Sequence, residues 1–497
     1  MKFTLKAALL ASVVFSAGSA FAANVPEGTK LADNQDYTYW LLDAIKSMDP
    51  QINTDVEGSG IMRSLFEGLF DEDQTGNLVP GVALDYDLSD DKTVYTFHLR
   101  PEAKWSDGTQ VKASDFVFAW QRLADPETAS PYQWFIEIMG VKHASTFPVR
   151  QDVIEEFGDK WTDPEHMVGN GAYVLTNHVL GEKVEMDPSP TYWDAEHTVL
   201  QHVTALTIND QNVALTRYLA GELDRVDIPT GQYPRLKAEY PDQAISVPQS
   251  CSYIYMFNMD EEKGPEALKD VRVRKALSYA IDRDTIVDKI LQGGQAPSYN
   301  WTHAATAGFE LPEIDYASWT QEERMAKAKE LLAEAGYGPE NPLDINIQYN
   351  TSEGHKKIAI AVQQFWKALG VNATLTNYEW KVHTDRMQNQ DFEVARYAWC
   401  GDYNEASTYL DLFTSYSGHN NGKFFSDEYD TLMKESKTAA DPNPMYTAAE
   451  QILADEMPFA PIYQYTKVEM IKPDMRGMST GNLMQNWYLK DMYRVAE

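Results

Sequence analysis

Apolar and polar residues alternate along two segments in the second half of the chain. Residues 343 to 349 place Leu, Ile, Ile and Tyr at every second position, and residues 371 to 375 repeat the pattern with Val, Ala and Leu. A period of two residues is typical of a β-strand with one buried face. The pattern therefore predicts two strands in this region.

Helical patterns precede each of these strands. Thr320 and Glu323 form a capping box before a run of Ala and Leu residues that ends at Gly336. A second helix is expected from about His355 to Leu369, where Gly370 follows as a stop signal. The order helix, strand, helix, strand predicts an α/β domain, which places ligands at the carboxyl ends of its strands.

The first half of the chain shows a weaker pattern. Residues 95 to 99 alternate as Tyr, Thr, Phe, His and Leu, and a Ser-Asp-Gly-Thr turn follows at residues 106 to 109. We predict a strand that leads into a turn. A chain of 497 residues is too long for one hydrophobic core, so two or three packed units are expected.

The first 22 residues have the composition of a secretory signal peptide. Lys2 and Lys6 precede a largely apolar run, and the segment ends in Ala20-Phe21-Ala22. We expect cleavage after Ala22. No Cys stands at this junction to carry a lipid anchor, so the mature protein is predicted to be free in the periplasm of a bacterium with two membranes.

Composition narrows the range of partners. The formal net charge of −33 disfavours nucleic acid and anionic membrane surfaces, and it is typical of an exported protein that stays soluble. Aromatic residues make up 12% of the chain. Most of them are expected in the core, although Tyr and Trp also suit a cleft that grips varied side chains.

The chain has only two cysteines, Cys251 and Cys400. In an oxidising compartment they are expected to pair, and closing so long a loop would stabilise the fold by roughly 5 kcal/mol. Two buried free thiols are the alternative.

Sequence motifs for other chemistry are weak or absent. We find no H-E-x-x-H, P-loop or G-x-G-x-x-G motif, and the ten histidines lack metal-ligand spacing. Residues 71 to 76 begin like a calcium loop, but its twelfth position is Val82 instead of a bidentate Glu, which favours a solvated turn. No metal, no cofactor and no enzymatic activity are predicted.

Residues 399 to 405, Trp-Cys-Gly-Asp-Tyr-Asn-Glu, closely resemble the W-C-A-D-Y-N-E stretch of bacterial periplasmic oligopeptide-binding proteins. These belong to the peptide and nickel solute-binding family. Further stretches match the family in order along nearly the whole chain. They are LFEGL at 65 to 69, FHLRPEAKWSDGT at 97 to 109, DPETASPY at 125 to 132, NGAYVL at 170 to 175, SPTYWD at 189 to 194, DVRVRKAL at 270 to 277 and YNTSEGHKKIAI at 349 to 360.

The resemblance implies two α/β lobes joined by a hinge, with a third, small domain. Expected boundaries are residues 23–66, 151–250 and 467–497 for domain I, 67–150 for domain II and 251–466 for domain III. The implied function is to capture short peptides, unchanged, for an inner-membrane ABC permease, and we expect a monomer. Alternatives are a relative dedicated to murein peptide, dipeptide, haem or nickel, and, more remotely, a secreted hydrolase.

The resemblance also implies particular site residues. Asp402 matches the aspartate that holds the peptide ammonium, and an enclosed ammonium needs such a carboxylate partner. His355 and Arg396 match groups that meet the peptide carboxylate. The remaining cleft residues carried over are Val56, Tyr132, Trp399, Cys400 and Tyr465. The two cysteines match the family's disulfide.

Three departures from the family pattern stand out. Thr54 replaces an acidic residue, and Leu291 replaces a lysine used for the shortest peptides. The segment between Tyr132 and Thr146 is shorter than in relatives by several tens of residues, so the small domain II is expected to be truncated.

Overall fold

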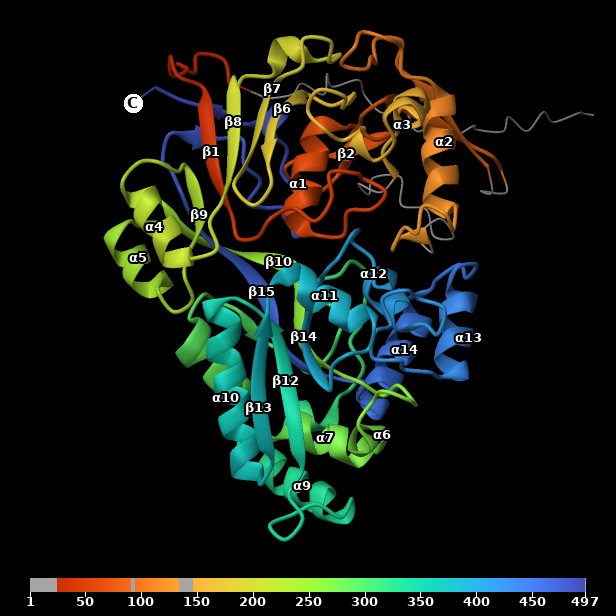
Figure 1. Ribbon diagram of the computed structural model, residues 1–497, viewed down its shortest axis with the longest axis vertical. Helices are drawn as coiled ribbons and strands as arrows, with labels where there is room; N and C mark the ends of the chain where they lie inside the picture. The colour runs from red at the N-terminus through yellow and green to blue at the C-terminus, as the bar shows by residue number, and fades with distance from the viewer. Residues whose placement is uncertain (1–24, 91–93, 134–145, 497) are drawn as a thin grey trace, which may run out of the picture.

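A computed structural model describes residues 25–90, 94–133 and 146–496. The predicted signal peptide, residues 1 to 22, lies outside the described residues. Two α/β lobes lie one above the other in Figure 1. Two long antiparallel strands run between them, β10 (Ala244–Phe257) and β15 (Phe459–Ile471). The two-lobed α/β fold expected from the sequence is confirmed.

One sheet of eleven strands passes through both lobes of the described chain, in the order β13-β12-β14-β10-β15-β9-β1-β8-β7-β6, with β11 beside β15. In the first lobe its strands are β1 (Asp36–Leu41), β6 (Tyr173–Val179), β7 (Lys183–Pro188), β8 (His202–Thr207) and β9 (Arg225–Asp227). In the second lobe they are β11 (Ala296–Pro297), β12 (Asp344–Asn350), β13 (Asn372–Tyr378) and β14 (Val394–Cys400). The pairing of β10 with β15 shifts register between Pro248 and Ser252, and this irregularity lies where the two lobes meet.

The predicted helices and strands of the second lobe are confirmed. Helix α9 (Gln321–Glu334) begins with the expected capping box at Thr320 and Glu323, and α10 (Glu353–Leu369) ends at Gly370, whose φ is +95°. The strands that follow them, β12 and β13, pair in parallel along their full length. The other helical segments of this lobe are α6 (Glu266–Lys269), α7 (Val271–Tyr279), α8 (Arg283–Thr285), the π-helix η5 (Ile286–Leu291), α11 (Trp380–Gln388), α12 (Ser407–Leu410), α13 (Asp427–Ser436) and α14 (Asn443–Glu456).

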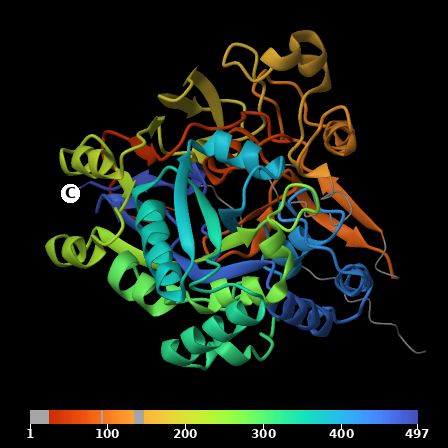
Figure 2. The same ribbon diagram turned by 60° about the horizontal axis from the view of Figure 1, so that its bottom comes forward.

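Alternate residues of β10 belong to two different cores. Tyr253 and Tyr255 pack with residues of α7, α9 and α10, whereas Ile254 and Met256 pack with Trp301 and residues of α13 and α14. This alternation is the two-residue period of a strand buried on both faces. Figure 2 accordingly shows helices on either side of the strands of the second lobe.

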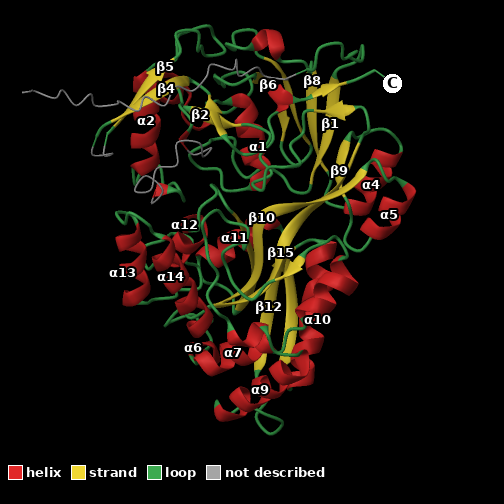
Figure 3. Ribbon diagram, turned by 180° about the vertical axis from the view of Figure 1, so that it is seen from behind, coloured by secondary structure: helices red, strands yellow, loops and turns green. Residues whose placement is uncertain are grey.

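The first lobe carries α1 (Val56–Leu65), α3 (Gln151–Phe157), α4 (Gln211–Leu219) and α5 (Tyr233–Glu239). Beside it, and outside the large sheet, lie α2 (Ala113–Ala124) and two hairpins, as Figure 3 shows from behind. The hairpins are β2 (Phe70–Glu72) with β3 (Leu78–Pro80) and β4 (Ala83–Leu88) with β5 (Tyr95–Leu99). The strand predicted at residues 95 to 99 is β5. Near the C-terminus, β16 (Met475–Arg476) pairs with β17 (Tyr493–Arg494).

Several stretches that resemble the oligopeptide-binding family meet in the interior of the first lobe. The carboxylate of Glu67 accepts hydrogen bonds from Tyr192 Oη (2.5 Å) and Trp193 Nε1 (2.7 Å), and Lys490 Nζ lies 3.6 Å away. Burial raises the pKa of Glu67 to about 7, while Lys490 opposes the shift. The side chain of Asn170 accepts a hydrogen bond from the backbone N–H of Glu67 and donates one to its C=O. Buried polar groups need hydrogen-bond partners, and these residues supply them to one another. The family resemblance of these stretches therefore reflects the packing of the first lobe.

Candidate ligand-binding site

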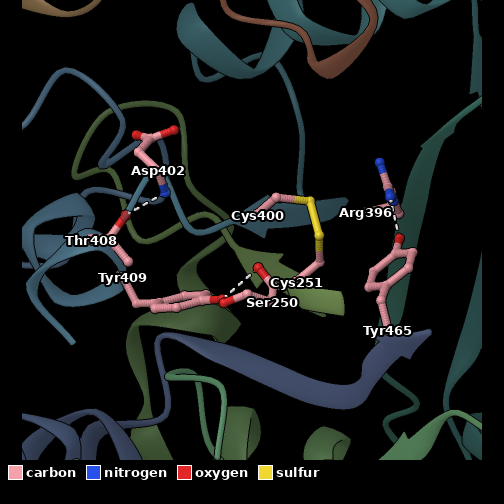
Figure 4. The surroundings of a disulfide bond; sticks show 8 residues. All are labelled: Ser250, Cys251, Arg396, Cys400, Asp402, Thr408, Tyr409 and Tyr465. Carbon is pink, nitrogen blue, oxygen red and sulfur yellow. Dashed lines mark hydrogen bonds between the residues drawn. A yellow bond between two sulfur atoms is a disulfide. The ribbon is translucent and has the colours of Figure 1, made fainter. Parts of the chain in front are cut away.

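The two cysteines form a disulfide between neighbouring strands. Cys251 of β10 stands directly opposite Cys400 of β14 in the antiparallel register, and their sulfur atoms are bonded (Figure 4). The predicted pairing is confirmed. The bridge fixes the end of β14 to β10 immediately before the loop that carries Asp402.

One edge of β14 is open next to this disulfide. β10 pairs with the strand along its whole length, whereas β12 pairs with it only at Val394 and Ala395. From Arg396 to Cys400, none of the described strands pairs with the second edge of β14. An unpaired strand edge offers a row of backbone donors and acceptors to an added extended chain.

At one end of this edge lies Arg396, held in a cluster of tyrosines. Its Nη2 donates to Tyr465 Oη at 2.7 Å and its Nη1 to Asn350 Oδ1 at 3.2 Å. The guanidinium also lies 4.9 Å from the ring centroid of Tyr253. Arg396 is 8% exposed. The sequence prediction that Arg396 and Tyr465 share a site is consistent with this contact.

Two histidines lie beside Arg396. The ring of His355, in the first turn of α10, is 5.6 Å from that of Tyr253, and His383 Nε2 is 2.9 Å from the carbonyl oxygen of Arg396. Burial, and then the positive charge of Arg396, lower the pKa of His355 well below its ordinary value. Burial likewise lowers the pKa of His383 to about 4. Both rings are therefore neutral near pH 7, and Arg396 is the positive charge of this cluster.

At the other end lies Asp402, in the loop after β14. Its backbone N–H donates to Thr408 Oγ1 at 2.8 Å, and the neighbouring Tyr409 donates from Oη to the carbonyl oxygen of Ser250 at 2.6 Å. Figure 4 shows Asp402 and Arg396 on opposite sides of the disulfide. Burial, and then the negative charge of Asp402, raise the pKa of Tyr132 well above its ordinary value. Asp402 thus acts electrostatically on a residue from the first half of the chain.

Tyr132 connects the two halves of the molecule at this end. It follows α2 in the sequence, is 3% exposed, and packs in the same core as Trp399. Its ring centroid is 6.5 Å from that of Trp399 and 5.6 Å from that of His419. Val56 stands apart from these contacts, because it begins α1 in the first lobe, is 56% exposed and lines a cavity there.

Several polar atoms of this region are buried and have no hydrogen-bond partner in the part of the chain that the structure describes. They include three atoms, Arg396 Nε, Trp399 Nε1 and His355 Nδ1, beside Tyr253 Oη and His383 Nδ1. Unpaired buried polar groups are rare in native proteins, and a ligand is one way to satisfy them. All three belong to residues that the sequence predicted for the site.

Five residues of the surroundings were missed by the sequence analysis: Tyr253, Asn350, His383, Thr408 and His419. Tyr253 has a signal, since it lies two positions after Cys251 and so on the same face of the strand. Asn350 belongs to a stretch that resembles the family. Thr408 and His419 lie outside the quoted stretches, and only the folded chain brings them to the site.

Two short motifs suggest other chemistry, and the structure explains each as a turn. Residues 477 to 481 have the G-x-S-x-G spacing of serine hydrolases, which the sequence analysis missed. However, Ser479 is 6% exposed, donates to the carbonyl oxygen of Gln74 and accepts from the N–H of Asn482, so it is no exposed nucleophile. In the calcium-like stretch, Asp73 accepts bonds from the N–H groups of Thr75 and Asn77, which confirms a turn.

The departures from the family pattern are only partly visible. Leu291 ends the π-helix η5 and is buried in the second lobe's core, so it is a packing residue. Thr54 lies two residues before α1. Most of the shortened segment, residues 134 to 145, lies outside the described residues.

The protein has two α/β lobes, two strands that run from one lobe to the other, and buried polar groups without a partner among the described residues. Together these features define a hinged ligand receptor. Comparison with known proteins agrees with this class. A sequence profile for bacterial extracellular solute-binding proteins, family 5 Middle, matches residues 77–153 and 141–421. The chain belongs to this family of solute-binding proteins.

Two curated relatives show how far the similarity extends. The periplasmic murein peptide-binding protein MppA of Escherichia coli is 40% identical over 100% of both chains. The periplasmic oligopeptide-binding protein OppA of Salmonella typhimurium is 38% identical over 99% of both. The alignment with MppA spans 541 positions against the 497 residues of this chain. The alignment is thus longer than this chain, which agrees with the shortened domain II expected from the sequence.

Solved structures show the same architecture and distinguish lobe arrangements. The structure of E. coli MppA has a TM-score of 0.90 at 39% identity, covering 94% of this chain and 100% of that one. Haemophilus influenzae OppA in complex with the peptide RPPGFSPFR has a TM-score of 0.89 at 34% identity, with the same coverage. The unliganded open form of MppA gives only 0.67, over 95% of this chain and 99% of that one. The lobes here are thus arranged differently from those of the open form.

No helix among the described residues has the length and apolar character needed to cross a membrane.

Proposed function

We propose that this protein is a periplasmic receptor that captures short peptides in extended form and delivers them, chemically unchanged, to an inner-membrane ABC peptide permease. The observation that carries the proposal is the open edge of β14. It runs from Arg396 toward Asp402, with a guanidinium at one end and a carboxylate beyond the other. A free peptide has the complementary charges at its two ends.

In the proposed complex the peptide backbone adds to the open edge of β14 as another strand. Main-chain hydrogen bonds give affinity that does not depend on side chains. Asp402 lies six positions after Arg396, which at about 3.3 Å per position allows up to about 20 Å between them. An extended peptide of three to five residues is about 10 to 17 Å long and fits within that span.

The proposed roles of the charged residues follow from their surroundings. Asp402 neutralises the peptide ammonium, in a setting where Tyr132 and its neighbours exclude water. Arg396 meets the peptide carboxylate, and neutral His355 donates or accepts a hydrogen bond beside it. The cleft walls against peptide side chains are Val56, Tyr132, Trp399, Cys400 and Tyr465.

The wider assignment rests on the predicted signal peptide and on the relatives, which are periplasmic binding proteins. We propose export with cleavage after Ala22, a monomeric mature protein and no enzymatic activity. We propose the domain boundaries expected from the sequence, with domain I at 23–66, 151–250 and 467–497, domain II at 67–150 and domain III at 251–466. The irregular pairing of β10 near Pro248, next to the boundary at 250, supports the position of the hinge.

Native mass spectrometry of protein purified from periplasm tests the proposal. We expect adducts with the masses of short peptides, which disappear after unfolding and refolding. Tri- to pentapeptides of varied side chains should then bind in calorimetry with free energies within a few kcal/mol of one another. A mixture incubated with the protein should keep its peptide masses unchanged. Peptide cleavage, bound haem or bound nickel would contradict the proposal.

A further inference from the structure

A cavity lined mainly by residues of the first lobe is present in addition to the open edge of β14. Its volume is about 100 Å³. This is several times the space that one water needs, but less than the roughly 300 Å³ or more of a pocket for a whole small-molecule ligand. Its size suits one side chain of a larger ligand. Val56, which the sequence places in the peptide cleft, stands at its edge and connects the two regions.

Every lining residue comes from the first lobe or the strands that leave it. The lining elements are β1, α1, β9, the interior of β10 at Gln249 and of β15 at Lys467, and the C-terminal residues Gln485 and Trp487. Trp487 packs edge-on against Tyr39 and lies over the guanidinium of Arg225. The cavity is therefore lined by the first lobe together with the two strands that link the lobes.

Helix α1 gives the cavity its open side. Val56, Gly60 and Arg63 follow one another at helical spacing on the face that lines it. Gly60 leaves space there, because a Cβ atom built at this residue meets no atom within 4 Å. A glycine inside a helix costs about 0.5 to 1 kcal/mol relative to alanine, so this one keeps a space open at the expense of stability.

Most charges of the lining are paired. Lys467 Nζ lies 2.7 Å from Asp227 Oδ1, and Arg225 Nε lies 2.6 Å from Glu469 Oε2. Arg63 is the exception, since it forms no ion pair with any other residue in the described ranges, and its buried Nε has no hydrogen-bond partner there. A guanidinium keeps its charge at every relevant pH. The lining thus holds a guanidinium that forms no ion pair with a described residue.

Glu57 is the remaining acid of the lining. Burial, then the negative charges of Asp55 and Asp43, raise the pKa of Glu57 to about 7, while Lys467 opposes the shift. The carboxyl group of Glu57 can therefore hold a proton near neutral pH, and in that form it does not repel an anion. Of the two groups without an ion pair, Arg63 carries the dependable charge.

We propose that this cavity is a side-chain subsite that accepts a carboxylate of the bound peptide and pairs it with Arg63, so that the receptor favours peptides with an acidic residue at one position. This inference rests on the proposed function. A carboxylate is small enough for the cavity and complements both the charge and the forked geometry of a guanidinium.

Calorimetry at pH 7 with six tripeptides tests the proposal, each being trialanine with Glu or Gln at one of its three positions. At one position we expect Glu to bind about tenfold more tightly than Gln, as a charged hydrogen-bonded pair provides. Arg63→Met should abolish that ratio. Gly60→Leu, which keeps Arg63 but fills the cavity and suits a helix, should abolish it too.

A matched control separates the site from overall charge. Arg235→Met removes an exposed arginine of the same lobe, on α5, and should keep the tenfold ratio. Equal binding of Glu and Gln at all three positions, or a ratio that survives both cavity variants, would overturn the subsite. Failure of all six peptides to bind would instead contradict the proposed function, so the two failures are distinguishable.

Discussion

The two ends of the open β14 edge are built in different ways. Arg396 sits on a regular strand, and its partners Tyr465, Asn350 and Tyr253 come from three other strands of the same sheet. Asp402 sits in a loop, held by Thr408 and by the neighbouring disulfide, and it acts electrostatically on Tyr132 from the first half of the chain.

This difference separates what is preformed from what needs lobe closure. The Arg396 end is complete within the second lobe, so it keeps its shape however the lobes are placed. The Asp402 end gains its enclosure only when Tyr132 packs against Trp399. We infer that Arg396, on the strand, forms a fixed site for the peptide carboxylate. Asp402, in the loop, becomes enclosed only when the lobes close. The following predictions test this contrast.

The largest expected effect follows removal of the disulfide. The double variant Cys251→Ser with Cys400→Ser should lower the free energy of unfolding by up to about 5 kcal/mol, because the cross-link no longer restricts the unfolded chain. Urea denaturation measures this change. Peptide binding should weaken for free and for carboxyl-amidated peptides alike, since the Asp402 loop loses its fixed end. An unchanged unfolding midpoint would show that the bridge contributes nothing.

Replacement of Arg396 should have a smaller and more selective effect. Arg396→Met should weaken binding of a free tripeptide by about 2 to 3 kcal/mol, because the peptide carboxylate loses a charged donor. The same peptide with an amidated C-terminus should bind wild type and variant alike. Tyr465→Phe removes only the 2.7 Å hydrogen bond to the guanidinium. Its affinity for the free tripeptide should therefore lie between those of the wild type and Arg396→Met. Calorimetry with both peptides would reveal a purely structural role of Arg396, because losing such a role would weaken the binding of both peptides equally.

A pH effect should follow from the histidine beside Arg396. The pKa of His383 is about 4 in the folded protein, against about 6.5 when unfolded. Its neutral form therefore contributes stability that is present above pH 6.5 and is lost as the pH falls toward 4. The loss should be about 2 kcal/mol at pH 4.5, measured by urea unfolding, and His383→Gln should remove it.

His303 provides the matched control for this pH effect. Burial lowers its pKa to about 4 as well, but it contacts none of the proposed site residues. His303→Gln should flatten the pH dependence of stability to a similar extent. Only His383→Gln should also change the pH dependence of peptide affinity, because His383 bonds the backbone of Arg396. Identical behaviour of the two variants in binding would contradict the link.

Elements with local sequence signals could be predicted from the sequence, whereas contacts made by tertiary packing could not. The helices and strands between residues 320 and 378 were predictable, because their apolar period and capping residues are local. Tyr132 lies 270 residues from Asp402 along the chain, and only tertiary packing brings it to within electrostatic reach. The cavity beside Val56 was likewise invisible, since its lining comes from six separate parts of the chain.

The family resemblance supplied what local patterns could not. It indicated Asp402, Arg396 and the disulfide pairing, and the structure shows that the disulfide lies between the two charged residues. It could not separate packing from binding, since the matching stretches around Glu67 and Trp193 form the first lobe's buried network. Spacing alone also misleads, as residues 477 to 481 have a hydrolase spacing but fold as a turn.

The most direct test of the account compares a free tripeptide with its N-acetylated form in wild type and in Asp402→Asn. The substitution keeps the shape of the side chain but leaves the ammonium without a counter-charge, so affinity for the free peptide should fall by about 2 to 5 kcal/mol. Acetylation should cause a similar loss in the wild type and little further loss in the variant, because both changes remove one interaction. Equal affinity of the wild type for both peptides would contradict the assignment of Asp402 as the ammonium site.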